Sequence, residues 1–436
     1  MALPHLAGTG EGAGEGDRGP LRAAFSGLTT RGRSFLAAGG AAGVCAYVLG
    51  QPDLLRVGVL LAALPLLCVL VLHGTRSRVT ATRSLAPARV AAGGEARVHL
   101  RVDNVARIPS GLLLLQDRVP YVLGPRPRFM LDRIEPGGRR EVTYRIRSEQ
   151  RGRYPLGPLQ LRLADPFGMV ELNRSFTTFD VMTVLPRIEP LPPVRLGGDA
   201  NGHGEGRQRA LAVAGDDDII PRDYRHGDDL RRVHWRSTAH RGSLMVRREE
   251  KPLKARCTVL LDTRRGGYIS SGPDSAFERA VSGAASAVLH LVAQGYEVRL
   301  VTDTGLLVPG PESQAGDTAE LTALIMETLA VIGHSAGTSL AEARAALRAA
   351  DCGLLLGFLG SVGAEETAVL EGLRQRATGA VGFVAAGQLP PQVEDERLRN
   401  VALAGWSALP LLPGVPLGQA WQRAALELAA RGTGAR

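Results

Sequence analysis

The sequence contains few cysteines, few aromatic residues and almost no lysine. Its four cysteines form no C-x-x-C pair and lie in apolar or strand-like segments, which excludes a disulfide scaffold and predicts small buried side chains. They are Cys45, Cys68, Cys257 and Cys352. Aromatic residues make up only 4% of the chain, so few side chains could stack on a single-stranded nucleic acid. We therefore expect no nucleic-acid partner.

The shortage of lysine makes arginine the main basic residue. Only Lys251 and Lys254 are lysines among the 52 basic residues, and the net charge is +9. Because arginine is frequent throughout the chain, a single arginine is weak evidence for a functional site. Local clustering of basic residues is more informative than the net charge of the whole chain. Residues 222–256 contain 11 basic and 5 acidic side chains, so most of the net positive charge lies in this one segment.

The length and composition indicate several domains. With 436 residues, of which 44% are hydrophobic and 22% charged, the chain is too long for one ordinary domain and too apolar to be mostly disordered. Residues 1–33 contain eight glycines and predict a flexible tail. The predicted order after this tail is a membrane hairpin over 34–73, a β-sandwich over 83–190, a linker over 191–215, a basic segment over 216–255 and an α/β domain over 256–436.

Two apolar stretches near the N-terminus, residues 34–50 and 54–73, are separated by Gln51-Pro52-Asp53. Their lengths and composition predict two membrane-spanning helices joined as a hairpin. Gly39 and Gly43 form a G-x-x-x-G pattern, which allows close approach of the two helices or of two copies of the chain. Packing within the hairpin and a homo-oligomer through these glycines are both open at this point.

Arginines lie on both sides of the hairpin and are scarce in its turn. Arg18, Arg22, Arg31 and Arg33 precede it, Arg76, Arg78 and Arg83 follow it, and Arg56 alone lies near the turn. Under the positive-inside rule both ends of the hairpin face the cytosol. We predict a two-pass protein of the cell membrane, with the lipid bilayer as a partner and with both termini and all soluble domains cytoplasmic.

The region after the hairpin alternates apolar and polar residues. Leu159, Leu161 and Leu163 show this period of two, and turn signals such as Asp165-Pro166-Phe167-Gly168 separate such runs at short intervals. The pattern predicts an all-β sandwich of Ig-like size.

From residue 256 onward the periodicity changes to alternating strands and helices. Strands are predicted over 257–261, 297–302 and 354–358, and helices over 277–294, 318–332 and 339–350. This alternation predicts a doubly wound, mostly parallel sheet, whose sites lie beyond the carboxyl ends of the strands. Asp262 and Asp303 follow two of the predicted strands.

The densest polar segment of the chain covers residues 222–250. Its pattern resembles the signature of the bacterial family called domain of unknown function fifty-eight, roughly Tyr-x-x-Gly-Asp-x-x-Arg-x-x-x-Trp-x-x-x-Ala-Arg and then Leu-x-Val-Arg-x-x-Glu. The matching residues are Tyr224, Gly227, Asp228, Arg231, Trp235, Arg236, Leu244, Val246, Arg247 and Glu250. Arg241 follows His240 where the family usually has Ala. The run Arg-Gly-Arg-Tyr-Pro-Leu-Gly-Pro over 151–158 extends the resemblance.

The resemblance implies a fold and a partner but no activity. Members of the family have an N-terminal two-helix hairpin, a β-domain and a C-terminal part similar to a von Willebrand factor A domain. They are typically encoded beside MoxR-type AAA+ ATPases. This implies a membrane-anchored scaffold or adaptor that works with such an ATPase in the assembly or maturation of other proteins. We expect no enzymatic activity and no cofactor.

Many von Willebrand factor A domains bind a metal through Asp-x-Ser-x-Ser after the first strand. Here Arg264 and Gly266 replace both serines after Asp262, and Gly357 stands where an acidic residue of a third loop is expected. Asp262 and Thr338 remain as remnants of a degenerate site, and Arg264 would place a positive charge beside a cation. We expect no metal, with Asp262 capping the following loop.

The basic segment leaves several functions open. Trp235 among arginines has the composition of a binding hot spot, whereas ion pairs of Asp228 and Glu250 with these arginines would join the two soluble domains. Asp228 or Asp229 is a candidate N-cap for a short helix that carries Leu230, Val233 and Ser237 on one face, followed by a strand over 244–250. The further alternatives are a metal-dependent hydrolase, with candidate residues His226, Asp228, His234 and His240, and a purely structural membrane protein. The histidine spacings do not match two ligands on one helical face.

Overall fold

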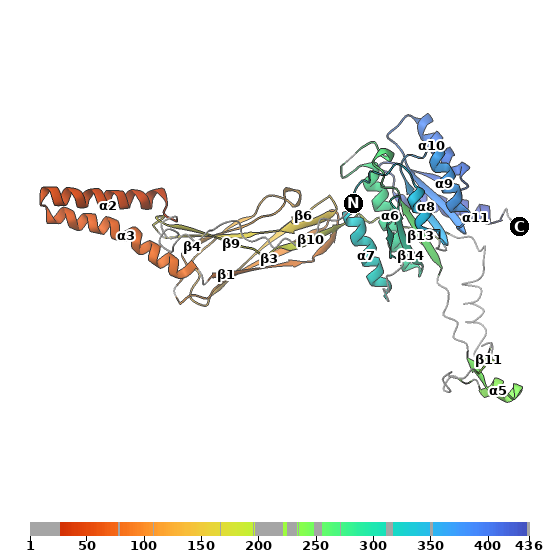
Figure 1. Cartoon of the computed structure of the whole chain (residues 1–436), viewed down its shortest axis with the longest axis horizontal. Coiled ribbons are helices and arrows are strands. Elements are labelled where there is room, and N and C mark those ends of the chain that lie inside the picture. The colour runs from red at the N-terminus through yellow and green to blue at the C-terminus, as the bar shows by residue number, and fades with distance from the viewer. Residues whose placement is uncertain are drawn as a thin grey trace. The chain divides into compact units, whose positions relative to one another are not determined.

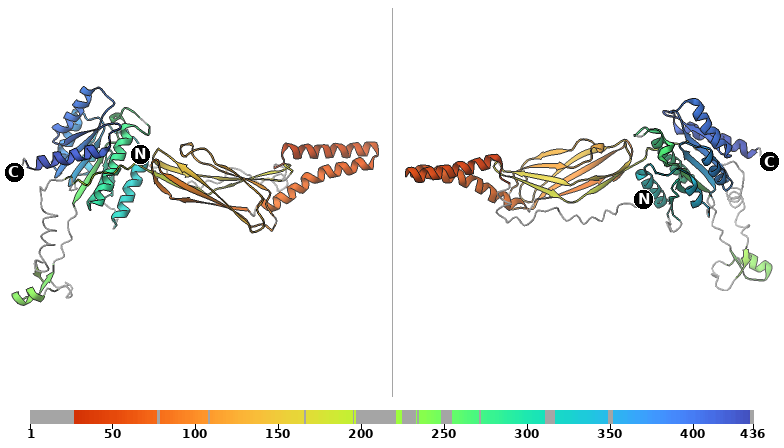
Figure 2. Two further views of the ribbon diagram at one scale, coloured as in Figure 1. Left: turned by 180° about the vertical axis from the view of Figure 1, so that it is seen from behind. Right: turned by 45° about the horizontal axis from the view of Figure 1, so that its top comes forward.

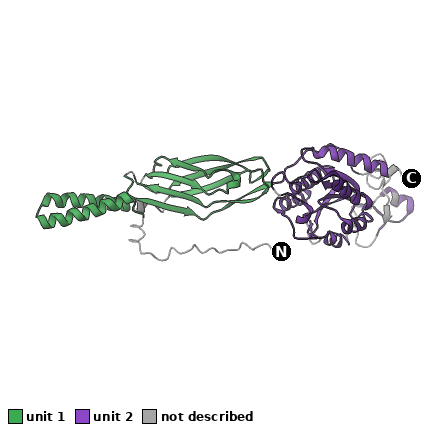
Figure 3. Ribbon diagram, turned by 90° about the horizontal axis from the view of Figure 1, so that it is seen from above, with its two compact units in different colours: residues 1–184 green, residues 185–436 purple. Residues whose placement is uncertain are grey.

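The computed structural model of the chain has two compact units, Met1–Val184 and Leu185–Arg436 (Figures 1 and 3). The structure describes residues 27–76, 79–107, 109–165, 167–194, 196, 221–224, 233, 235–247, 255–270, 272–310, 317–348 and 352–433. Most of the predicted tail over 1–33 and most of the predicted linker over 191–215 therefore lie outside the described residues.

The first unit begins with two apolar helices, as predicted. They are α2 (Thr30–Leu49) and α3 (Pro52–Arg76), which run side by side as a hairpin (Figure 1). Thr29 caps α2 by accepting a hydrogen bond of 3.3 Å from the Gly32 N–H, and α2 ends at Gly50 with φ of +64°, a conformation that favours glycine. Both helices are long and apolar enough to cross a membrane, and only 17% of each apolar window is buried in the described structure.

The two helices approach closely at Gly39. A Cβ atom added there would lie 2.8 Å from the Gly58 carbonyl oxygen and 2.9 Å from the Ala62 nitrogen, so only glycine fits. At Gly43 an added Cβ would meet no atom within 4 Å. The two glycines therefore differ: the Cβ position of Gly39 faces α3, whereas that of Gly43 faces open space, although the Gly43 nitrogen would lie 3.0 Å from a Cβ added at Gly58. A homo-oligomer through Gly43 stays a prediction.

The β-rich part of the first unit forms three sheets with the orders β1-β3-β6, β2-β10-β7 and β5-β4-β8-β9. The strands are β1 (Val79–Ala86), β2 (Arg89–Ala91), β3 (Glu95–Asn104), β4 (Leu112–Asp117), β5 (Arg128–Leu131), β6 (Arg139–Arg147), β7 (Gly152–Leu156), β8 (Leu159–Ala164), β9 (Glu171–Phe176) and β10 (Asp180–Leu185). In β3 and β8 every second side chain is buried, which is the predicted period of two. The base of the hairpin packs against this core through Phe35, Leu36 and Cys68.

A buried ion pair joins strands within this core. Arg83 of β1 donates to both carboxylate oxygens of Asp117 at the end of β4, at 3.0 and 2.8 Å, and the two side chains are 2% and 0% exposed. Tyr144 of β6 donates to the same carboxylate at 2.6 Å. Burial and this hydrogen bond raise the pKa of Tyr144 above its ordinary value, so the phenol keeps its proton.

The second unit contains a six-stranded sheet with the order β15-β14-β13-β16-β17-β18. Every neighbouring pair is parallel except β14 and β15, so the predicted α/β sheet with mostly parallel strands is confirmed. The strands are β13 (Arg256–Leu261), β14 (Glu297–Thr302), β15 (Leu307–Val308), β16 (Leu354–Leu359), β17 (Gly379–Ala385) and β18 (Ser407–Leu411).

Helices cover both faces of this sheet (Figure 2). The helices are α6 (Ala276–Ala293), α7 (Thr318–Val331), α8 (Ala341–Ala346), α9 (Ala364–Arg374), α10 (Pro391–Leu403) and α11 (Leu417–Thr433). Residues of α6, α7 and α11 form one buried cluster with Trp421, and residues of α8, α9 and α10 form the other with Trp406. Of the helix predicted over 339–350, the described residues 339–348 form only α8.

Candidate functional site

The strand order of the second unit creates a switch point between β13 and β16. Numbered along the chain, the parallel strands have the order 2-1-3-4-5, so the connections leaving β13 and β16 run in opposite directions across the sheet. In open α/β sheets ligands bind outside the carboxyl ends of strands at such a point. The loops that meet here begin at Asp262 after β13, Asp303 after β14 and Gly360 after β16.

Arg264 fills this point with its own guanidinium group. Nε and Nη2 donate to the two oxygens of Asp262, each at 3.0 Å, and Nη1 donates to Glu366 at 2.5 Å. The remaining N–H groups reach the carbonyl oxygens of Thr338 at 3.2 Å and of Ser361 at 2.8 Å. All five N–H groups of the guanidinium are thus used.

The electrostatics of this cluster hold Arg264 as a cation. Burial opposes the charge, but the hydrogen bond and charge of Asp262, together with Glu366, outweigh burial and raise the pKa of Arg264. The side chains of Arg264, Asp262 and Glu366 are 6%, 0% and 13% exposed. Two carboxylates and one guanidinium therefore share a desolvated site in which each charge has a partner.

The carboxylate of the neighbouring Asp303 is also fully engaged, but by hydroxyl and backbone amide donors and not by a guanidinium. Its Oδ1 accepts hydrogen bonds from the backbone N–H and the hydroxyl of Thr263, at 2.7 and 2.5 Å. Its Oδ2 accepts from the Ser335 hydroxyl at 2.6 Å. Tyr268 donates to the Asp262 carbonyl oxygen at 2.8 Å, and burial with the charges of Asp262 and Asp303 raises the pKa of Tyr268. The carboxylates at the switch point are thus engaged in internal bonds.

The donor set does not fit the metal site of a von Willebrand factor A domain. The Asp262 carboxylate accepts a hydrogen bond from the backbone N–H of Arg264 at 3.0 Å, as expected for a residue that caps a loop. Both of its oxygens also accept hydrogen bonds from the Arg264 guanidinium. Thr338 lies at the site and contributes its carbonyl oxygen to Arg264. A divalent cation would compete with the fixed positive charge of Arg264 for the same oxygens. Among the described residues, no three His, Cys, Asp or Glu side chains are grouped so that they could hold a metal ion.

One position in the sequence-based interpretation of this site was wrong. The third-loop acidic residue was expected at the position of Gly357, but Gly357 lies inside β16, which continues to Leu359, and the loop begins at Gly360. The strand is longer because the run from Leu354 to Leu359 is buried on both faces. Glu366, which no pattern in the sequence indicated, also reaches the site from the first turn of α9.

The described part of the basic segment forms a small β-ladder and a helix. Strand β11 (Pro221–Asp223) pairs antiparallel with β12 (Met245–Arg247), and α5 (Trp235–Arg241) lies between them in the sequence. The Met245 N–H donates to the Thr238 hydroxyl at 3.0 Å and so fixes the end of α5 to β12. Val233 was expected on the helix, but it bridges to Val246 before the helix begins, since a β-branched residue suits an extended backbone.

The structure shows where several signature residues lie. Trp235 is 70% exposed, Arg236 and Arg241 are exposed, and Tyr224 is half-buried with its N–H bonded to the Leu244 carbonyl oxygen at 2.8 Å. Arg247 is the last residue of β12. The residues outside the described part are Gly227, Asp228, Arg231 and Glu250, together with His226 and His234; His240 is exposed near the end of α5.

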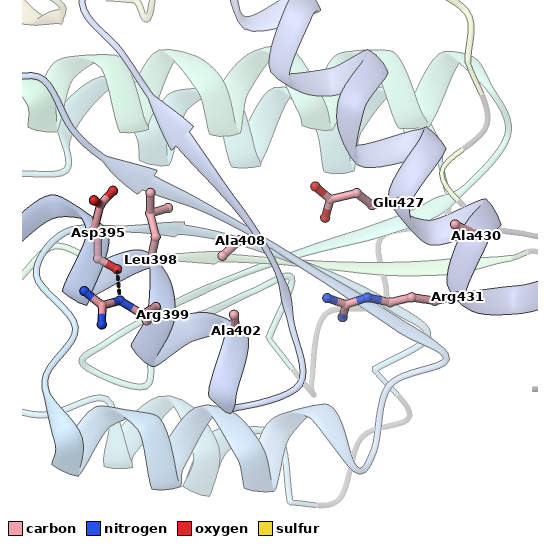
Figure 4. A pocket seen from close by; sticks show the side chains of 8 residues that line it. All are labelled: Asp395, Leu398, Arg399, Ala402, Ala408, Glu427, Ala430 and Arg431. Carbon is pink, nitrogen blue, oxygen red and sulfur yellow. Dashed lines mark hydrogen bonds between the residues drawn. The ribbon is translucent and has the colours of Figure 1, made fainter. Parts of the chain in front are cut away.

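An open pocket of about 720 Å³ lies between α10 and α11 beside β18 (Figure 4). It is lined by Asp395, Leu398, Arg399, Ala402, Ala408, Glu427, Ala430 and Arg431. Arg431 donates to the carbonyl oxygens of Gly405 at 3.0 Å and Trp406 at 3.2 Å, so it completes the turn before β18. Its two carboxylates and two guanidinium groups balance in formal charge, so the lining carries no net charge that would favour an anion or a cation.

Comparison with known proteins gives one family. Residues 221–358 match the family model described as Protein of unknown function DUF58. Over these residues the chain matches the DUF58 family model. The DUF58 match begins in β11 and ends in β16, so it contains both the exposed Trp235 and the Arg264 cluster, and it confirms the resemblance seen in the signature.

Similarity to individual proteins is weak. No curated protein matches this chain. Among solved structures it is similar to the CARDB domain of a Pyrococcus furiosus protein, with 16% identity, 24% of this chain and 92% of that chain covered, and a TM-score of 0.18. It is also similar to alkylpurine DNA glycosylase AlkC of Pseudomonas fluorescens (18% identity, 29% and 38% covered, TM-score 0.17) and to the sporulation control protein Spo0M of Bacillus subtilis (14%, 34% and 58%, TM-score 0.16). At these scores the likenesses carry no conclusion about fold or function.

Proposed function

We propose that this protein is a membrane-anchored adaptor that binds a cytosolic protein through the surface around Trp235. The exposure of Trp235 carries the proposal. A tryptophan that is 70% exposed leaves most of its ring open to a partner, and Trp and Arg are enriched among the residues that contribute most to binding at protein interfaces. The alternative role, an ion-pair network between the soluble domains, depends on Asp228 and Glu250, which lie outside the described residues.

The anchoring part of the proposal rests on the hairpin. Large apolar side chains cover its outer surface, and the largest exposed fractions belong to Tyr47 at 91%, Val48 at 74% and Leu70 at 72%. A soluble helix would bury such residues, whereas a bilayer accepts them. The arginines on both sides of the hairpin favour cytoplasmic placement of both termini and of the soluble parts, which is the topology that we propose.

We further assign the two soluble parts to an Ig-like sandwich and a von Willebrand factor A-like domain, and the partner to a MoxR-type AAA+ ATPase. Family resemblance supports these finer assignments. Arg264 restricts how this domain could bind a partner. A bound metal can bridge to an acidic residue of a partner, whereas the Arg264 guanidinium cannot, because all its N–H donors are already used within the domain. Binding at this domain is therefore proposed to be independent of divalent cations and to include no catalytic step.

The experiment is a pull-down of the ATPase from membranes that contain the full chain. Trp235→Ala should lower the recovered ATPase by about tenfold or more, the loss typical of a hot spot. Leu426→Ala, a change at a residue that is 72% exposed on α11, is the matched control and should leave recovery unchanged. Equal recovery with Trp235→Ala and wild type would refute the proposal. Elemental analysis of the purified protein for zinc and manganese checks the hydrolase alternative.

A further inference from the structure

An exposed aromatic residue lies at the base of the hairpin. Phe167, in the loop between β8 and β9, is 58% exposed. We propose that this phenylalanine inserts into the interfacial layer of the bilayer and fixes the depth of the β-rich region against an anionic membrane surface. This inference rests on the proposed membrane anchoring and names the lipid contact that the soluble part of the same unit makes.

The loop of Phe167 is bonded directly to the start of α2. The Thr29 hydroxyl donates to the Gly168 carbonyl oxygen at 2.7 Å, and the Thr29 N–H donates to the Met169 carbonyl oxygen at 2.9 Å. The Glu171 N–H donates to the Gly27 carbonyl oxygen at 2.8 Å. Gly32 lies against Met169 so closely that any side chain there would collide with the Met169 carbonyl. The loop and the first turn of α2 therefore move as one body.

The length of α2 sets the depth of this loop. Its 20 residues extend about 30 Å, which equals the thickness of the hydrocarbon core of a bilayer. If α2 spans that core, Thr30 lies at its edge, and the bonded loop lies at the same level. Phe35 and Leu36, about one and a half turns beyond Thr30 on α2, pack against the core of the β-rich region, so this end of the region reaches at least as far as the helix start.

The loop holds Phe167 outward rather than leaving it to fold back. Asp165, which is 7% exposed, accepts hydrogen bonds from the Phe167 N–H at 3.0 Å and from the Val170 N–H at 2.6 Å. Gly168 follows with φ of +66°, a conformation that favours glycine. A turn fixed in this way presents an apolar ring to its surroundings, and Phe is among the apolar residues that interfacial segments bury at the boundary between headgroups and acyl chains.

Basic residues next to the loop match an anionic lipid surface. Arg31 and Arg33 are exposed in the first turn of α2. A Cβ atom added to Gly168 would lie 3.7 Å from Nη1 of Arg31, so this guanidinium lies over the loop. An apolar ring beside exposed cations, continuous with an apolar helix, fits a bilayer with anionic headgroups better than it fits a soluble protein.

The test is depth-dependent quenching of a single added tryptophan in the full chain. Phe167→Trp is reconstituted in vesicles of phosphatidylcholine and phosphatidylglycerol whose acyl chains carry bromine near the headgroup, and the signal of the native tryptophans is subtracted. Tyr121→Trp is the matched control, because Tyr121 is 91% exposed and follows the opposite end of β4, about 17 Å along that strand from the end paired with Ala164. We expect the brominated lipid to quench Trp at 167 and to shift its emission to the blue, and to leave Trp at 121 unchanged.

The outcomes separate this inference from the proposed anchoring. If the full chain is extracted from native membranes by alkaline carbonate, the anchoring itself is wrong. If the chain stays in the membrane but Trp at 167 is quenched no more than Trp at 121, the insertion of Phe167 is refuted while the anchoring stands. Protection of Trp at 167 only when cytosolic protein is added would mean that a protein, not lipid, covers the loop, and would also overturn the inference.

Discussion

Arg264 donates two hydrogen bonds, each of 3.0 Å, to the carboxylate of Asp262, which lies two residues earlier in the chain at the end of β13. The pair lies at the switch point of the sheet, the place where an α/β fold ordinarily opens to a ligand. A side-chain cation here means that the fold supplies internally the positive charge that its acidic residues require. The Arg264 guanidinium thus occupies the place that a bound cation could take in such a site.

Replacing Arg264 with Leu should destabilise the second unit strongly. The change leaves Asp262 and Glu366 buried without a counter-charge, and breaking such a buried pair costs about 3–5 kcal/mol. Urea unfolding followed by tryptophan emission measures this, because Trp406 and Trp421 are fully buried in the two cores of the unit. Arg265→Leu, at the exposed neighbouring arginine, should change the midpoint little. A loss for Arg264→Leu no larger than for Arg265→Leu would show that the pair is not essential.

Replacing Arg264 with Ser should create a cation site. The smaller side chain removes the fixed charge and adds a hydroxyl oxygen beside Asp262 and Glu366, which are oxygen ligands of the kind that Mg²⁺ and Mn²⁺ bind. Millimolar MnCl₂ should therefore raise the unfolding midpoint of Arg264→Ser and leave that of the wild type unchanged. A rise in the wild type, or none in the variant, would contradict the role assigned to the guanidinium.

Patterns along the chain predicted the elements better than the site. The alternation in β8 identified its buried face because a half-buried strand has a period of two, and the apolar run before Asp262 identified β13 because a central parallel strand is buried on both faces. Asp262 and Arg264 were recognised from their positions after that strand. Glu366 could not be found in this way, since it is 102 residues from Arg264 and only the strand order and the start of α9 bring it there.

In the basic segment, the residue types indicated a possible site more clearly than they indicated the secondary structure. Its residue types indicated a functional surface, which stays a prediction, and Trp235 is 70% exposed. Local spacing misplaced Val233, however, because the antiparallel ladder of β11 and β12 supplies a partner, Val246, that a helical pattern does not reveal. Tertiary pairing overrode local propensity at this residue.

Glu394 should protect the loop after β17 in a pH-dependent way. Its Oε1 accepts hydrogen bonds from the N–H groups of Gly387, Gln388 and Leu389 at 2.6, 2.9 and 3.0 Å. Partial burial opposes the charge, but these bonds and the nearby Arg397 lower the pKa of Glu394. Its stabilising contribution is therefore complete above the ordinary glutamate pKa of about 4.3 and is lost as the pH falls through the lowered value.

Amide hydrogen exchange at this loop measures the effect. In Glu394→Ala the three amides should exchange faster than in the wild type at neutral pH, and the two proteins should converge once the pH is below the lowered pKa. Glu396→Ala changes an exposed carboxylate on the same helix and should leave the loop unchanged. A difference between Glu394→Ala and wild type that persists unchanged into strong acid would mean that the carboxylate charge does not hold the loop.

The hairpin should tolerate a large side chain at Gly43 but not at Gly39. A Leu at position 39 would push its Cβ into the Gly58 carbonyl oxygen, and overpacking of this kind costs about 1–3 kcal/mol. At position 43 the side chain would enter open space beside the hairpin. In mild detergent, the temperature at which half of the full chain aggregates should fall for Gly39→Leu and stay at the wild-type value for Gly43→Leu. If Gly43→Leu is the more damaging change, Gly43 contacts a second copy of the chain, and the homo-oligomer rather than the single hairpin is the stable form.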